Sequence, residues 1–314
     1  MNIQWYPGHM TKAKRAMKED IKLIDLIIEL VDARVPLSSR NPDIDELGAG
    51  KARMVLLNKS DLADDRLNEQ WIRYFSEKGF HVLKVNCKSG AGLKQINATV
   101  QEACKEKIER DRRRGILNRP VRAMVVGIPN VGKSTFINAF AGKACAKTGN
   151  KPGVTKGNQW IRLNKTLELL DTPGILWPKF EDQQVGLKLA FTGAINDDIL
   201  DAQTLATAFI NHMMVVNPDC IRKRYNIEFD TIAEPHDVLR QIAEARGFKL
   251  KGDEPDLERA SKILMDEYRG GKLGRLTLEL PEDINDMLAE KEAREKEKAQ
   301  TDKARKAEYK KRKK

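Results

Sequence analysis

The sequence predicts an α/β protein with a mostly parallel sheet and helices on both faces, followed by an all-α domain and a basic tail. Short apolar segments alternate with segments of helical periodicity in the first part of the chain, as in parallel sheets. One apolar segment, Val121–Val126, runs into the glycine-rich loop Gly127–Ser134, which has the pattern G-x-x-x-x-G-K-S. After about residue 178 the strand patterns fade and helical patterns recur. We therefore expect domains at residues 1–178 and 179–285 and a charged tail at 286–314.

The strands are expected in segments of four to six residues that are rich in apolar, often β-branched side chains and lie between turn signals. These segments are Leu26–Val31, Met54–Leu57, His81–Val85, Val121–Val126, Gln159–Leu163 and Thr166–Leu170. Helices are expected where apolar residues recur every three to four positions. Those segments are Thr11–Leu23, Leu67–Lys78, Leu93–Arg114, Thr135–Ala141, Gln183–Thr192, Ala202–Val215, Pro235–Ala245 and Asp256–Arg269.

The composition indicates an anionic partner. The chain of 314 residues has a net charge of +11, and its last twelve residues, Lys303–Lys314, hold eight basic side chains and one acid, Glu308. Nucleic acid is the first candidate partner, and a merely solvated basic surface is the alternative. The four cysteines have no Cys-x-x-Cys spacing, so we expect reduced thiols rather than a zinc site. No apolar run could cross a membrane and the first residues lack signal-peptide features, so a cytoplasmic location is expected.

The loop Gly127–Ser134 is predicted to bind phosphate. Its glycines permit close approach of the backbone, and successive N–H groups at the start of a helix face an anion. Lys133 would reach the β- and γ-phosphates as the catalytic cation, and the Ser134 hydroxyl would bind Mg²⁺. An ordinary glycine-rich turn is the alternative. The residues expected to contact nucleotide here are Asn130, Val131, Gly132, Lys133, Ser134 and Thr135.

A second motif, Asn58-Lys59-Ser60-Asp61, follows an apolar strand and is expected to select guanine. The Asp61 carboxylate can accept from guanine N1–H and the 2-amino group, neither of which adenine offers. The stem of Lys59 can lie along the base, and Asn58 can fix the loop. On its own this tetrad is also a good turn, but with a phosphate loop it indicates GTP and GDP binding.

Further nucleotide and metal contacts are expected in three loops. Asn86, Cys87 and Lys88 stand where GTPases carry a loop whose backbone N–H meets the guanine oxygen, and an ordinary turn is the alternative. Asp171 begins a D-x-x-G pattern in which it would hold Mg²⁺ through water, while the Gly174 N–H would meet the γ-phosphate. Thr155 would be the second Mg²⁺ ligand from its side chain.

The order of these motifs is unusual, because the guanine-reading motifs precede the phosphate loop. The sequence thus resembles circularly permuted P-loop GTPases. Together with the N-terminal segment Gln4–Met10 and the triplet Asp32–Arg34, the motifs resemble the bacterial ribosome biogenesis GTPase A (YlqF-type) family. The resemblance implies a GTPase that acts in late assembly of the large (50S) ribosomal subunit and contacts ribosomal RNA through its C-terminal domain. The alternative is a GTPase module of an RNA-modification or other RNA-associated regulatory protein.

Hydrolysis is expected to be slow until the ribosome stimulates it. The position where many GTPases place a water-orienting Gln is Ile175, so another residue must act, and His9 is the candidate. Asn130 also resembles the residue of potassium-activated GTPases, which makes K⁺ a possible cofactor beside Mg²⁺. We expect a monomer in solution, without a membrane partner, whose nucleotide state reorients the C-terminal domain through the connection after Gly174.

Overall fold

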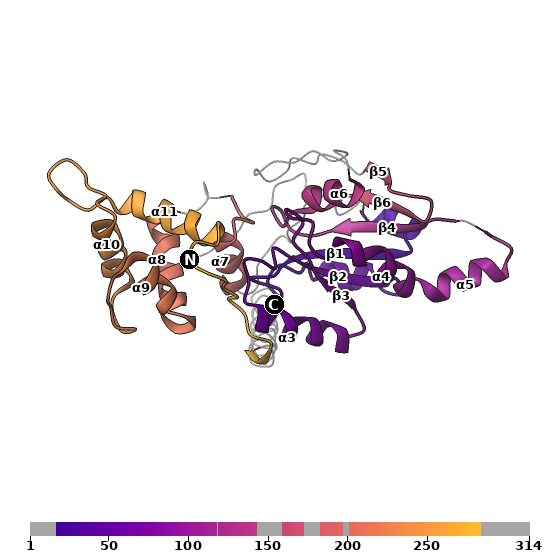
Figure 1. Ribbon diagram of the computed structural model, residues 1–314, viewed down its shortest axis with the longest axis horizontal. Helices are drawn as coiled ribbons and strands as arrows, with labels where there is room; N and C mark the ends of the chain where they lie inside the picture. The colour runs from indigo at the N-terminus through magenta and orange to yellow at the C-terminus, as the bar shows by residue number, and fades with distance from the viewer. Residues whose placement is uncertain (1–16, 118, 143–158, 173–182, 197–200, 284–314) are drawn as a thin grey trace, which may run out of the picture. The chain divides into compact units, whose positions relative to one another are not determined.

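A six-stranded sheet forms the first half of the molecule (Figure 1). The computed structural model describes residues 17–117, 119–142, 159–172, 183–196 and 201–283. The strand order is β3-β2-β1-β4-β6-β5, and every neighbouring pair is parallel except β5 and β6. The mixed α/β prediction with a mostly parallel sheet is therefore confirmed. The strands are β1 (Leu26–Asp32), β2 (Ala52–Asn58), β3 (His81–Lys84), β4 (Val121–Val126), β5 (Gln159–Arg162) and β6 (Leu167–Asp171).

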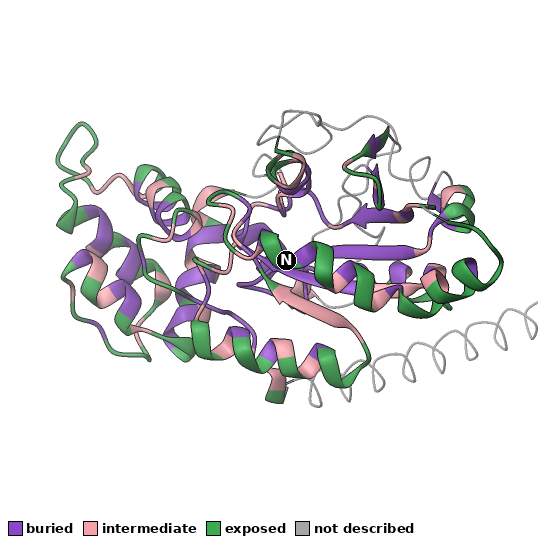
Figure 2. Ribbon diagram, turned by 45° about the vertical axis from the view of Figure 1, so that its right-hand side comes forward, coloured by how far each residue is buried: buried purple, intermediate pink, exposed green. Residues whose placement is uncertain are grey.

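The centre of the sheet is buried because its strands are apolar almost throughout. All seven residues of β1 are buried, and β4 is buried except at Arg122 (Figure 2). Continuous apolar runs of this kind are typical of parallel strands covered on both faces. The acid within β1, Glu29, is paired with Arg40 at 2.9 Å and Arg53 at 3.3 Å, so its burial leaves no unpaired charge.

The chain changes direction across the sheet between β1 and β4. The path from β1 through β2 to β3 extends the sheet on one side, and β4 then returns to the other side of β1. Helix α3 (Asp65–Glu77) follows β2, whereas α4 (Ile96–Ala103) and α6 (Lys133–Ala141) follow β3 and β4. Right-handed crossovers in opposite directions place such helices on opposite faces. The carboxyl ends of β1 and β4 flank this switch point, which is where open α/β sheets bind ligands.

One predicted helix is divided in the structure. The segment expected as a single helix over Leu93–Arg114 comprises the 3₁₀ turn η2 (Leu93–Gln95), α4 and α5 (Lys105–Arg113). The break falls at Cys104, whose φ of −107° and ψ of 14° are not helical. Cys104 is buried in the core, whereas α5 is charged and its Lys107 pairs with Asp25 at 3.2 Å. The apolar segment thus forms α4 and the charged segment forms a separate helix, α5.

The second half of the molecule is helical in the described residues. Its helices are α7 (Gln183–Phe191), α8 (Ala202–Val216), α9 (Asp219–Tyr225), α10 (Pro235–Ala245) and α11 (Leu257–Arg269). Helices α8, α10 and α11 pack on one another and α7 packs on α8, with their apolar faces inward (Figure 2). Aromatic rings join them, since Phe209 lies 5.3 Å from Phe191 and 4.7 Å from Tyr268 between ring centroids. Helix α9, which begins after Pro218, was not among the predicted helices.

The described elements that remain are short. They are η1 (Ile21–Leu23), α2 (Asp43–Leu47) and η4 (Pro281–Asp283). Residues 17–278 belong to one compact unit and residues 279–283 to a second. The boundary predicted between residues 178 and 179, and the tail at 286–314, lie outside the described residues and stay predictions. No helix in the described part of the chain is long and apolar enough to span a membrane.

Candidate nucleotide-binding site

The phosphate-loop motif forms the turn between β4 and α6. Gly132 caps the helix with a left-handed φ of 101°, which a side chain rarely adopts. A Cβ atom at Gly132 would lie 2.5 Å from Asn58 Nδ2, and one at Gly127 would lie 2.7 Å from the Leu30 carbonyl oxygen. Ser134 is half-buried and Thr135 exposed in the first turn of α6. The N–H groups at this helix start can therefore face an anion, as the motif predicts.

Lys133 and Asp171 form a buried pair of opposite charges beside this loop. Lys133 Nζ donates to the carbonyl oxygens of Gly127 and Ile128, both at 3.0 Å. Burial lowers the pKa of Lys133 to about 8 and raises the pKa of Asp171 to about 6, and the charge of each residue opposes the shift of the other. Among the described residues, Asp171 Oδ1 is buried with no hydrogen-bond partner. A carboxylate oxygen without a hydrogen-bond partner, next to a loop that can bind phosphate, is suited to accept from the water shell of a Mg²⁺ ion bound to that phosphate.

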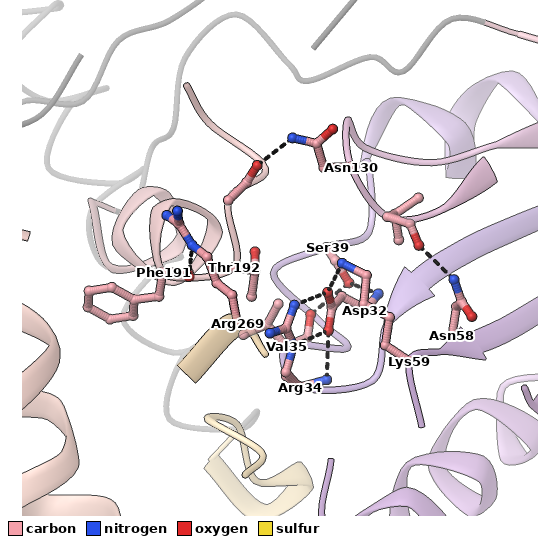
Figure 3. Close-up of polar contacts among 12 residues, drawn as sticks. Asp32, Arg34, Val35, Ser39, Asn58, Lys59, Asn130, Phe191, Thr192 and Arg269 are labelled. Atoms are coloured by element: carbon pink, nitrogen blue, oxygen red, sulfur yellow. Dashed lines mark hydrogen bonds and ion pairs between the residues drawn. The ribbon is translucent and has the colours of Figure 1, made fainter. Parts of the chain in front are cut away.

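Asn58 joins the phosphate loop to the predicted guanine loops, and Figure 3 shows its bond to the phosphate loop. Its Nδ2 donates to the Val131 carbonyl oxygen at 2.8 Å, and its Oδ1 accepts from the Cys87 N–H at 3.1 Å. Cys87 is buried, and burial raises the pKa of its thiol to about 12, so the side chain stays a neutral thiol. Three motifs far apart in the sequence are thus held at one edge of the sheet.

Lys59 follows Asn58 in a left-handed conformation with φ of 59°. Its Nζ pairs with Asp32 Oδ2 at 2.9 Å, at the end of the neighbouring strand β1 (Figure 3). Asp32 also accepts from Arg34 Nε at 2.8 Å and Arg34 Nη2 at 2.7 Å. Asp61, two residues after Lys59, is exposed. The tetrad therefore presents an anchored lysine and an accessible carboxylate on one loop.

The loop Asn86–Lys88 is closed by its own asparagine. Asn86 Oδ1 accepts from the N–H groups of Lys88 at 2.9 Å and Ser89 at 3.0 Å, which is an Asx-type turn. The loop also lies beside the tetrad, because the Val85 carbonyl oxygen accepts from the Ser60 hydroxyl at 3.0 Å. Both predicted guanine loops therefore occupy the carboxyl ends of β2 and β3.

Asn130 links the phosphate loop to the helical part of the molecule. Its backbone is left-handed, with φ of 56°, and its Nδ2 donates to the Gly193 carbonyl oxygen at 2.7 Å (Figure 3). Gly193 lies two residues after the end of α7. A loop expected to hold phosphate is thus bonded to the first described helical segment after β6.

The structure brings most of the predicted site residues together but does not describe them all. His9, Thr155 and Gly174 lie outside the described residues. Conversely, sequence reasoning assigned no role to the side chains of Asp32 and Arg34. Their pattern could have indicated a role, because an acid and an arginine follow directly after the predicted apolar strand Leu26–Val31.

A family model described as "50S ribosome-binding GTPase" matches residues 122–218, which include the phosphate loop and Asp171. Full-length relatives are also similar. The protein "Ribosome biogenesis GTPase A" of Bacillus cereus is 50% identical over 295 residues, covering 93% of this chain and 98% of that protein. The protein of the same name in Thermotoga maritima is 32% identical over 289 residues, covering 92% of this chain and 98% of its own.

Two solved structures of YlqF are also similar to this chain. A GDP-bound structure of YlqF matches with a TM-score of 0.62 and 28% identity, over 86% of this chain and 100% of the YlqF chain. A GNP-bound YlqF from T. maritima matches with a TM-score of 0.61 over 86% of this chain and 99% of its own. The similarity therefore includes both the sheet and the helical part.

Proposed function

This chain belongs to the ribosome biogenesis GTPase A family, and we propose that it is a GTP-hydrolysing switch in late assembly of the large (50S) ribosomal subunit. The observation that carries the nucleotide part of the proposal is the bridge made by Asn58. One side chain holds the phosphate loop through Val131 and the guanine loop through Cys87. A site in which both loops are held together can bind the base and the phosphates of one guanine nucleotide at the same time.

The GTPase domain is a circular permutation of the common P-loop order. In this chain the strands that carry the guanine loops, β2 and β3, precede the phosphate-loop strand β4, yet all three belong to one sheet. Cutting and rejoining a chain at surface loops preserves such a sheet. The permuted GTPase domain at residues 1–178 then leads directly into an all-α domain at 179–285.

The nucleotide contacts follow from the loops. Asp61 accepts from the guanine edge, the stem of Lys59 lies along the base, and the Asn86–Lys88 loop closes over the guanine oxygen. Lys133 and the N–H groups of 130–135, together with Gly174, hold the phosphates. Ser134, Thr155 and Asp171, the last through water, would hold Mg²⁺, and the ion would supply positive charge beside the phosphates.

Turnover is slow in the free protein and stimulated by the ribosome. The D-x-x-G segment is followed by Ile175, which cannot orient water. We assign that role to His9, whose neutral imidazole can hold an attacking water. Asn130 would help to hold K⁺, which would supply positive charge near the transferring phosphate. A His9→Ala variant with full ribosome-stimulated turnover would place the water-orienting role on another residue.

The partner is ribosomal RNA, bound by the helical C-terminal domain and the basic tail. A chain with net charge +11 binds RNA phosphates with an affinity that falls steeply with salt. A folded helical surface suits structured RNA, which offers shape rather than an open major groove. GTP favours binding, and GDP releases the protein, which acts as a cytoplasmic monomer.

Two other functions remain as alternatives: a GTPase module of an RNA-modification or other RNA-associated regulatory protein, and a binding module with a structural nucleotide. GTP turnover measured with and without purified large subunits separates them. Stimulation by large subunits and not by small subunits supports the assembly switch. Turnover that large subunits leave unchanged contradicts it.

A further inference from the structure

Asp32 balances two cations at the end of β1. Its carboxylate is buried and accepts from Arg34 through Nε and Nη2 and from Lys59 through Nζ, all within 2.9 Å. Burial alone would raise the pKa of Asp32, but the charges of Arg34 and Lys59 hold it well below its ordinary value. Asp32 is therefore a permanent anion that fixes the ammonium of Lys59.

Arg34 connects this anion to the helical part of the molecule. Its guanidinium carbon lies 5.2 Å from the centroid of the Tyr268 ring, close enough for a cation–π contact. Its carbonyl oxygen accepts from the Leu278 N–H at 2.8 Å. Its side chain is 2% exposed, so the guanidinium has little room to move without moving its neighbours.

Tyr268 lies near the end of α11, next to Arg269, which Figure 3 shows near Arg34. Its ring packs on Phe209 of α8, with 4.7 Å between centroids. The next residue, Arg269, donates to the carbonyl oxygens of Ala190 and Phe191, directly before the Gly193 turn that Asn130 contacts. The carboxyl end of α11 therefore contacts Arg34, which is bonded to Asp32, and the end of α7, just before the Gly193 carbonyl that Asn130 contacts.

We propose that Arg34 is a positioning residue that holds Lys59 in the guanine site through Asp32 and transmits the state of that site to α11 through Tyr268. This inference rests on the proposed guanine-binding function, and it adds a route to the helical domain besides the connection after Gly174. A base lying on Lys59 restrains the lysine, which restrains Asp32 and Arg34. The Tyr268 ring and the segment 276–278 are then held more firmly.

A purely structural ion pair would stabilise the fold without this transmission, and two substitutions distinguish the cases. Tyr268→Leu removes the ring but leaves Asp32, Arg34 and Lys59 intact, whereas Tyr268→Phe keeps the ring as the matched control. Arg34→Lys keeps the charge but cannot form the two-pronged contact with Asp32. Circular dichroism of each full-length variant establishes that it is folded.

The experiment measures GDP affinity by titration and amide hydrogen exchange over residues 257–278 with and without GDP. In the native protein and Tyr268→Phe, GDP should slow exchange in this segment, including the Leu276 and Leu278 amides that bond to the Leu62 and Arg34 carbonyl oxygens. Tyr268→Leu should bind GDP within about threefold of native but lose at least half of that protection. Arg34→Lys should bind GDP about tenfold more weakly.

The outcomes separate this inference from the function on which it rests. A native protein that binds GDP without any change in exchange over 257–278 would overturn the inference and leave the guanine site intact. Full protection in Tyr268→Leu, or native GDP affinity in a folded Arg34→Lys variant, would also overturn it. A native protein that does not bind GDP at all would instead overturn the proposed function.

Discussion

Asn58 Nδ2 donates to the carbonyl oxygen of Val131 at 2.8 Å, although the two residues are 73 positions apart in the chain. This hydrogen bond joins the loop after β2 to the loop after β4. The amide also accepts from the Cys87 N–H, so no single hydroxyl or apolar side chain could replace it. The arrangement of the nucleotide site therefore depends on one buried residue.

Replacing Asn58 by alanine should weaken both stability and nucleotide binding. The change leaves the Cys87 N–H and the Val131 carbonyl oxygen without their buried partner, which costs about 1–3 kcal/mol. We expect GDP affinity to fall at least tenfold in titrations and the urea midpoint to decrease. Asn97→Ala, at an exposed asparagine on α4, is the matched control and should change neither. GDP affinity within twofold of native in Asn58→Ala would contradict the bridging role.

Asp61→Asn should change the base preference from guanine toward xanthine. The native carboxylate accepts from two guanine donors, and an amide can instead donate to the 2-oxo group of xanthine. We expect GTP to bind about a hundredfold more weakly and XTP to bind better than GTP, measured by competition against a fluorescent nucleotide. The native protein should bind ATP far more weakly than GTP. Equal binding of ATP and GTP would end the guanine assignment.

His212 on α8 should contribute a loss of stability between pH 7.5 and 5.5, which the raised pKa of Asp171 partly offsets. Burial lowers the pKa of His212 to about 4, the charge of Lys188 lowers it further, and the Leu278 backbone opposes the shift. The ordinary pKa of histidine in the unfolded chain is 6.5. As the pH falls below that value, the unfolded chain takes up a proton that the folded chain refuses, so stability is lost progressively toward pH 4.

The size of this effect over pH 7.5 to 5.5 is about 1 kcal/mol from the two pKa values. His212→Phe should remove it, because the ring still packs near Phe191 but does not titrate. Urea unfolding at both pH values gives the difference, with His236→Phe at an exposed position of α10 as the control. If the difference in unfolding free energy between the two pH values is the same in His212→Phe as in the native protein, His212 is not the group responsible.

GTP turnover should depend on the monovalent cation. The Asn130 amide nitrogen is bonded to Gly193, and the carbonyl oxygen of the same side chain is the proposed K⁺ ligand. We expect turnover about tenfold faster in KCl than in NaCl at equal ionic strength. Asn130→Asp, which keeps an oxygen and tolerates the left-handed backbone, should retain part of the preference, and Asn130→Ala should lose it. Identical native rates in the two salts would exclude a potassium site.

The sequence was sufficient for the sheet because its strands are continuous apolar runs. The predicted strands Leu26–Val31 and Met54–Leu57 fall inside β1 and β2, and the motifs after them lie at the predicted carboxyl ends. Local pattern is enough when a strand is buried on both faces, because nearly every position is apolar; in β1 the exception Glu29 is paired with Arg40 and Arg53.

Contacts between distant segments could not be predicted in this way. The Arg34–Tyr268 contact depends on how α11 lies against the loop after β1, and nothing local to Asp32–Arg34 encodes it. The break at Cys104 was missed because helical periodicity continues across it. Helix α9 was missed because seven residues are too short for a clear periodic signal. Tertiary packing, rather than local propensity, decides these features.

We expect GTP and GDP to set the affinity of this protein for the large ribosomal subunit. Co-sedimentation of the full-length protein with purified immature large subunits tests this, using a non-hydrolysable GTP analogue or GDP at low and moderate salt. We predict that the analogue retains the protein with the subunit, that GDP releases it, and that salt weakens both interactions. Equal co-sedimentation in both nucleotide states would contradict the switch, and no co-sedimentation under any condition would contradict the ribosomal assignment.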